Sequence, residues 1–160
     1  MEVKAQHHYP KGVEAVLAAF GNKKKIEARF AAMGARNIAV QTCKLTKTGM
    51  DMSMTREVPV DAPSLLKKFM GEWNQVTQVE HWTGSAAKGF TGELTLTLHG
   101  VPVTITGTLH LHGDASSCTN DICMKFESAV PLVGKKLADF VASGAAKEMQ
   151  REYEFIRANL

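Results

Sequence analysis

The chain has 160 residues, of which 44% are hydrophobic and 22% are charged, and its net charge is +3. These values fit one packed domain over residues 1–160 and exclude an intrinsically disordered chain. The charge is too small to predict a nucleic-acid partner, and no apolar run approaches the roughly 18 residues that an integral membrane segment needs.

Cysteine usage and the first residues both bear on location. The three cysteines, Cys43, Cys118 and Cys123, form no disulfide-framework spacing, which fits a reducing compartment. The opening Met1–Lys4 has no apolar signal-peptide region after it. We therefore expect a cytoplasmic protein.

The N-terminal part predicts a short strand followed by two helices. Residues 2–9 form the strand, and Pro10 stands where the first turn of a helix tolerates proline. Apolar residues then recur at helical spacing: Val13, Val16, Leu17 and Phe20. Gly21 ends this helix, and Asn22 caps a second helix that ends at Gly34.

A dense basic run lies on the second predicted helix. It consists of Lys23–Lys25 with Arg29 close behind. We interpret this run as a solvated helix face in preference to a phosphate-binding patch.

The middle of the chain is rich in predicted strands. In the last three of these strands, apolar and polar residues alternate with a clear period of two. One or two helical turns are predicted at 61–70, where a capping residue and a proline begin the segment. The predicted strands lie at 37–47, 49–59, 73–83, 90–98, 103–111 and on from Ile122 to Val130.

A long helix is predicted after Pro131, over residues 132–159. It would span roughly 40 Å at 1.5 Å per residue, enough to cross a six- or seven-stranded sheet. Alternating strands give a sheet one dry face, which the apolar stripe of this helix can cover. The predicted fold class is therefore α+β: a curved antiparallel sheet of about six to seven strands wrapped around a long C-terminal helix, with two short helices after the first strand.

This element order and five short segments along it resemble a known superfamily. The segments are Thr55–Pro59, Leu65–Phe69, Glu80–Trp82, Gly100–Val103 with Gly107, and Val130–Leu137. They are similar to the START-like (SRPBCC) superfamily, the helix-grip proteins that include birch-pollen-allergen-like proteins. Within it, the chain resembles an uncharacterised bacterial domain-of-unknown-function family, number 2505. The resemblance implies a helix-grip fold with a ligand cavity, and it carries over no catalytic residue.

The dry face of the sheet and the facing helix supply the predicted cavity wall. Methionine suits such a wall because its side chain is flexible and polarisable, and a small residue in mid-helix leaves space beside the sheet. The alternative is a filled core that needs no ligand. The predicted wall comprises Met50, Met52, Met54, Arg56, Glu80, Trp82, Leu94, Leu96, Leu98, Ile105, Leu109, Ile122, Met124, Phe126, Leu137, Phe140, Val141 and Gly144.

Two members of this wall are charged. Arg56 continues the parity of Met54, and Glu80 shares the parity of Gln78 and Trp82. A buried charge needs a partner, so we expect Arg56 and Glu80 to approach each other across adjacent strands. They form either a structural pair at the rim, the simpler interpretation, or a polar end that orients a ligand's carbonyl or carboxylate group.

Histidines on the opposite face raise the question of a metal site. His110 and His112 are two residues apart on one strand face, and His99 on the neighbouring strand is a possible third zinc ligand. The same face is rich in threonine, so we interpret it as solvent-exposed surface. We predict neither a metal nor a cofactor.

Three functions remain open from the sequence. The first is a binding or carrier protein for a small hydrophobic molecule of the lipid, fatty acid, isoprenoid or polyketide type. The second is a cyclase-like enzyme that uses Arg56, Glu80 or His81, although no catalytic motif is present. The third is a protein-interaction module with a filled core. Edge strands permit an oligomer but do not imply one.

Overall fold

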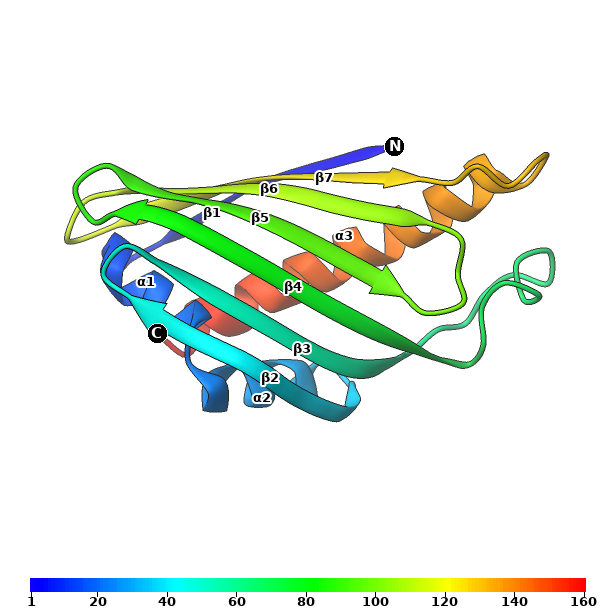
Figure 1. The fold of residues 1–160 in the computed structure, drawn as a ribbon, viewed down its shortest axis with the longest axis horizontal. Helices are drawn as coiled ribbons and strands as arrows, with labels where there is room; N and C mark the ends of the chain where they lie inside the picture. The colour runs from blue at the N-terminus through cyan, green and yellow to red at the C-terminus, as the bar shows by residue number, and fades with distance from the viewer.

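A seven-stranded antiparallel sheet curves over one long helix in the computed structural model, which describes residues 1–160 (Figure 1). The strand order is β1-β7-β6-β5-β4-β3-β2, so consecutive strands from β2 to β7 are neighbours and β1 pairs with β7. The elements are β1 (Glu2–Tyr9), α1 (Val13–Phe20), α2 (Lys23–Ala32), β2 (Arg36–Thr46), β3 (Gly49–Pro59), β4 (Trp73–Ser85), β5 (Gly89–Leu98), β6 (Thr104–Gly113), β7 (Cys118–Glu127) and α3 (Gly134–Ala158).

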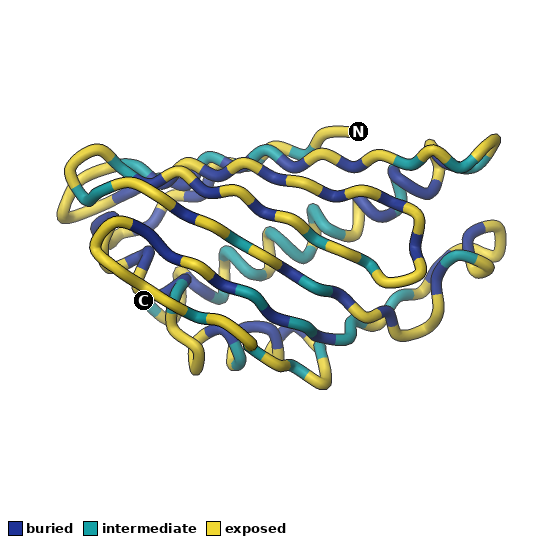
Figure 2. The backbone as a smooth tube through the Cα atoms, in the orientation of Figure 1, coloured by how far each residue is buried: buried dark blue, intermediate teal, exposed yellow.

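The sheet has one buried face, as the alternation in the sequence predicts. Buried and exposed residues alternate along β3 to β7 (Figure 2). On β3, Met50, Met52, Met54 and Arg56 all point inward. Helix α3 runs diagonally behind this face, α2 packs against β2, and α1 lies at one end of the sheet, where it contacts β6 (Figure 1). The predicted α+β helix-grip class is confirmed.

Local chemistry explains most of the helix boundaries. The side chain of Asn22 accepts a hydrogen bond from the backbone N–H of Lys25 at 3.0 Å and so caps α2 as predicted. Gly34 follows α2 with φ +90°, a left-handed conformation that glycine adopts at no steric cost.

Two predicted boundaries are wrong. Helix α3 begins at Gly134 rather than residue 132, because Leu132 has φ +69° and cannot belong to a right-handed helix. Pro10 lies before α1, whose first residue is Val13. The segment 61–70 forms turns, and the bond from the backbone N–H of residue 67 to the carbonyl of residue 63 closes a single helical turn, the lower of the two predicted lengths.

None of the three helices combines the length and the apolar character that a membrane-spanning helix requires.

Candidate functional site

A cavity of about 520 Å³ lies inside the curved sheet, against α3. Its volume is within the range of roughly 300–1,000 Å³ that is typical of small-molecule sites. Side chains from all three helices and from every strand except β2 line it, and most of them are hydrophobic. This cavity is the candidate functional site.

Most of the predicted wall residues line this cavity. On the sheet they are Arg56, Glu80, Trp82, Leu94, Leu96, Leu98, Ile105, Leu109, Ile122, Met124 and Phe126, and on α3 they are Phe140, Val141 and Gly144. Their side chains reach the cavity because period-two alternation sends them all to the inner face of the sheet.

The methionines of β3 are not part of the lining, which corrects the predicted methionine wall. Met50, Met52 and Met54 are buried in the hydrophobic core, on the strand next to the edge strand β2. A Cβ atom on Gly21, at the end of α1, would stand only 2.7 Å from the sulfur of Met50. Leu137 is likewise fully buried outside the lining. These residues pack against protein, whereas the residues of β4 that lie opposite the three methionines, Trp82, Glu80 and Gln78, line the cavity.

A chain of hydrogen bonds runs along the wall on β3 and β4. Arg56 Nη1 donates to Gln78 Oε1 at 3.0 Å, and Gln78 Nε2 donates to Glu80 Oε1 at 2.6 Å. Trp82 Nε1 donates to Glu80 Oε2 at 2.9 Å. Arg56 and Glu80 are therefore linked through Gln78 instead of pairing directly, because the register places Val76 opposite Arg56.

The guanidinium group of Arg56 is buried and cationic. It lies 4.1 Å from the centroid of the Phe30 ring, a cation–π distance. Burial lowers the pKa of Arg56 to about 10, although the carboxylates of Glu152, Glu148 and Glu80 oppose this shift. A guanidinium has five N–H donors, and only the bond to Gln78 forms. Its other donor atoms are not sealed in the protein, so they are open to the cavity.

Glu80 is the second ionisable group on this wall. Burial raises its pKa, and the hydrogen bond from Trp82 only partly opposes this effect. A carboxyl group in such an environment holds its proton to a higher pH than an exposed one. Glu80 is therefore a site at which acid–base chemistry is possible.

A further polar group on β1, β7 and α3 was missed by the sequence analysis. The ring of His7 stacks on Tyr153 with 4.2 Å between centroids, and Tyr9 meets Tyr153 edge-on at 5.4 Å. Burial lowers the pKa of His7 and raises that of Tyr9, so both are neutral near pH 7. Asn120 Oδ1 is buried without a hydrogen-bond partner. The alternation in residues 2–9 places His7 and Tyr9 on the apolar side of β1, so this part of the site could have been found.

Arg29 also faces the cavity, which corrects the interpretation of the basic run. Lys23–Lys25 are exposed as expected, but the side chain of Arg29 is only 4% exposed. Its Nε atom lies 3.2 Å from Glu152 Oε1, an ion pair without the alignment of a hydrogen bond. Arg29 also lies 5.1 Å from the centroid of the Phe30 ring, so Phe30 contacts two guanidinium groups.

The mouth of the cavity is marked by lining residues that are exposed to solvent. They lie after the end of β3 and along the middle of α3: Asp61, Ser143, Gly144, Lys147 and Arg151. A Cβ atom on Gly144 would meet no atom within 4 Å. Open space therefore surrounds this position at the mouth of the cavity.

The other histidines considered from the sequence lie outside the cavity. His81 is exposed on the outer face of β4, where its Nδ1 atom contacts Asp51. His99 follows β5, and its Nε2 atom bonds to the hydroxyl group of Thr77 at 2.7 Å. His81 therefore cannot contribute to chemistry inside the cavity.

This arrangement, an antiparallel sheet wrapped around a C-terminal helix with a cavity between them, is the START-like helix-grip fold. The protein TTHA0849 from Thermus thermophilus has it, with a TM-score of 0.66 at 12% identity over 99% of this chain and 95% of that one. A START superfamily protein from Mycobacterium smegmatis gives 0.53 at 5% identity over 99% and 95%. The protein Ara h 8.0201 gives 0.59 at 7% identity over 99% and 98%. At these identities the likeness shows the fold alone.

The family follows from the sequence itself. The family model described as a protein of unknown function, DUF2505, matches residues 4–160. The chain therefore belongs to the DUF2505 family, as the resemblance indicated. No curated protein matches it.

Proposed function

We propose that this protein binds or carries a small hydrophobic molecule, of the lipid, fatty acid, isoprenoid or polyketide type, in the cavity between the sheet and α3. The observation that carries the proposal is the combination of an unfilled cavity of about 520 Å³, a mainly apolar wall and one buried cation with free donors. The fold of START-like relatives supports it.

The apolar wall favours an apolar occupant. Protein interiors are normally packed as densely as organic crystals, so the wall residues lose dispersion contacts where the cavity is empty. An occupant that removes this wall from water gains about 25 cal/mol per Å² of apolar surface. The open volume also argues against an interaction module with a filled core, because this core is not filled.

Arg56 defines the polar end of the proposed ligand. Its open N–H groups lack acceptors, and an acceptor oxygen of a ligand, from a carbonyl or carboxylate group, would complete them. The neighbouring Gln78 holds the guanidinium in place. We therefore propose the orienting role for Arg56 in preference to a purely structural pair with Glu80.

Native mass spectrometry of freshly purified protein tests the proposal. We expect a co-purifying apolar mass that denaturation releases. The control is a pair of variants on β5: Leu96→Trp fills the cavity from the inner face, whereas Thr95→Trp adds the same ring to the exposed outer face. Only Leu96→Trp should lose the adduct. A clean apo mass, with no shift in melting temperature across a panel of fatty acids and polyketides, would contradict the proposal.

Glu80 supports a second candidate function, a cyclase-like or other acid–base enzyme. A carboxyl group whose pKa is raised by burial in a cavity is a common feature of catalytic sites. Glu80→Gln keeps the hydrogen-bond acceptor for Trp82 but cannot transfer a proton. If the bound molecule from the wild-type protein differs from that of Glu80→Gln by a cyclisation or isomerisation, the enzymatic interpretation is supported. An identical molecule in both supports a carrier.

A further inference from the structure

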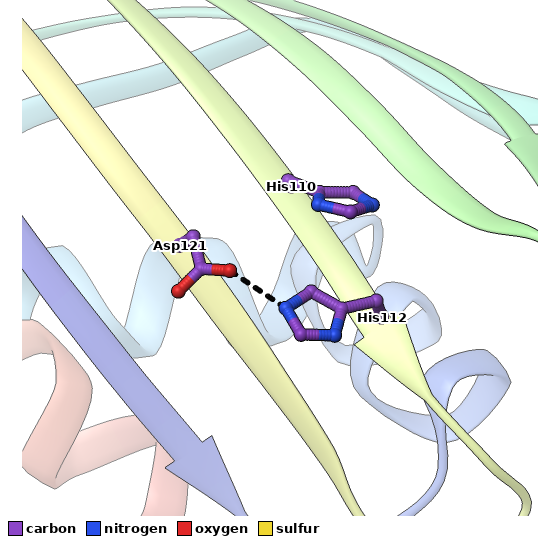
Figure 3. Close-up of side chains that lie close together, drawn as sticks. All are labelled: His110, His112 and Asp121. Atoms are coloured by element: carbon purple, nitrogen blue, oxygen red, sulfur yellow. Dashed lines mark hydrogen bonds and ion pairs between the residues drawn. The ribbon is translucent and has the colours of Figure 1, made fainter.

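A second cluster of ligating side chains lies on the outer face of the sheet, outside the ligand cavity. His110 and His112 extend from β6, and Asp121 extends from the neighbouring strand β7 (Figure 3). The register places Asp121 directly opposite His110. One ring nitrogen of each histidine and a carboxylate oxygen of Asp121 all lie within 4.8 Å of one another.

The sheet itself fixes this cluster. Residues two apart on a strand share a face, so the two histidines stand side by side, with 4.6 Å between ring centroids. Hydrogen bonding between β6 and β7 then brings the carboxylate of Asp121 to them, and its Oδ2 atom lies 2.6 Å from His112 Nε2. The third member is therefore Asp121 and not His99, because His99 is bonded to Thr77 elsewhere on the face.

A fourth side chain orients the carboxylate. Gln6, on the edge strand β1, donates from Nε2 to Asp121 Oδ1 at 2.8 Å, which leaves Oδ2 turned toward the histidines. Metal-binding carboxylates in proteins are commonly held in this way by a second side chain.

We infer that His110, His112 and Asp121 form a binding site for Zn²⁺ or another late first-row divalent cation. Two imidazole nitrogens and one carboxylate oxygen are the donor types that such ions prefer. Ligand atoms around a tetrahedral zinc ion lie about 3.3 Å apart, so only small rotations of exposed side chains separate this cluster from that geometry. The site has three protein ligands and faces solvent, so water completes the coordination.

The charges and protons of the binding step balance simply. The Zn²⁺ ion accepts one lone pair from each imidazole and one from the carboxylate, and no group is oxidised or reduced. Before the metal binds, His112 Nε2–H donates to the Asp121 carboxylate, and when the metal takes this place the proton passes to His112 Nδ1 or to water, which frees the Nε2 lone pair. The bound ion would link β6 to β7, and through Gln6 to β1.

Isothermal titration calorimetry with zinc sulfate, on protein freed of any affinity tag, tests this site. We expect saturable binding of one ion per chain. His112→Ala and Asp121→Ala should each weaken binding at least tenfold, and Gln6→Ala, which touches no metal, should weaken it by a smaller factor. His99→Ala is the matched control, since it removes an exposed histidine outside the cluster and should leave the affinity unchanged.

Cobalt substitution gives a second readout that does not depend on stability. Co²⁺ in a site with histidine ligands has visible absorption bands, which should appear with the wild-type protein and His99→Ala and vanish with His112→Ala. Melting curves of the metal-free variants verify their folding, which we expect to be intact because all these side chains are at least partly exposed. The inference is wrong if the wild-type protein shows no saturable binding, or if His99→Ala weakens it as much as His112→Ala.

Discussion

Replacing Arg56 with methionine separates ligand recognition from fold stability. Burial lowers the pKa of Arg56 from its ordinary value to about 10, which makes its charged form about 3 kcal/mol less favourable in the folded chain than in the unfolded chain. The unfolded chain therefore holds this proton more tightly, and the cost applies in full at every pH below about 10. Arg56→Met removes this cost of burying the charge.

Two losses oppose this gain. Without its donor, Gln78 Oε1 is left unpaired inside the protein, which costs about 1–3 kcal/mol. The cation–π contact with Phe30 is also lost, at about 0.5–2 kcal/mol. The terms nearly cancel, so we expect the free energy of unfolding of Arg56→Met to stay close to that of the wild-type protein. At roughly 2–4 °C per kcal/mol for a chain of this size, the melting temperature should move by only a few degrees.

The effect on ligand binding should be much larger. A hydrogen bond to a charged group contributes about 1.5–3 kcal/mol, equivalent to at least a tenfold loss of affinity for an apolar carboxylate such as dodecanoate. Fluorescence displacement of a bound anilinonaphthalene dye measures that affinity, and thermal unfolding measures the stability. Arg36→Met is the matched control, because Arg36 is exposed and stacks on Trp73 outside the cavity.

Two outcomes would refute this reasoning. If Arg56→Met binds dodecanoate as tightly as the wild-type protein, Arg56 does not orient the ligand. If it lowers the free energy of unfolding by 3 kcal/mol or more, Arg56 is chiefly one half of a structural pair, since breaking such a pair costs about 3–5 kcal/mol.

Substitutions at three further positions test the site. Burial raises the pKa of Glu80, so the charged form of its carboxyl group destabilises the folded state at high pH. Glu80→Gln should therefore raise the melting temperature at pH 8 but not at pH 4. An equal change at both pH values would contradict this prediction. Burial lowers the pKa of His7, so the unfolded state takes up a proton before the folded state does as the pH falls, and stability decreases. His7→Gln should therefore reduce the loss of stability between pH 7 and pH 5. Equilibrium urea unfolding at several pH values measures this dependence of stability on pH. Gly144→Ala should add about 0.5–1 kcal/mol of stability with unchanged binding, because open space surrounds that position. Gly144→Phe should slow the association of dodecanoate in stopped-flow measurements, and equal rates for both variants would show that Gly144 is not at the mouth.

Much of the fold could be predicted because local geometry enforces it. Side chains on a strand alternate between faces whatever their tertiary partners are, so period two alone placed Arg56, Gln78 and Glu80 on the inner face. The apolar stripe after Pro131 likewise predicted α3 and its role in covering the sheet. The family resemblance agreed with both.

Tertiary structure decided which inward residues meet empty space. The methionines of β3 and the leucines of β5 have the same pattern in the sequence, yet the methionines are enclosed in the core and only the leucines line the cavity. Arg29 follows three exposed lysines, and only the packing of α2 turns it inward to Glu152.

The sequence by itself determined the order of the elements, the two faces of the sheet and the inward direction of Arg56 and Glu80, because these depend on residues close together in the chain. Tertiary structure alone decided the link through Gln78, the open volume and the meeting of Asp121 with His110 and His112. Those features depend on register between strands and on helix placement, and both result from contacts between residues far apart in the sequence.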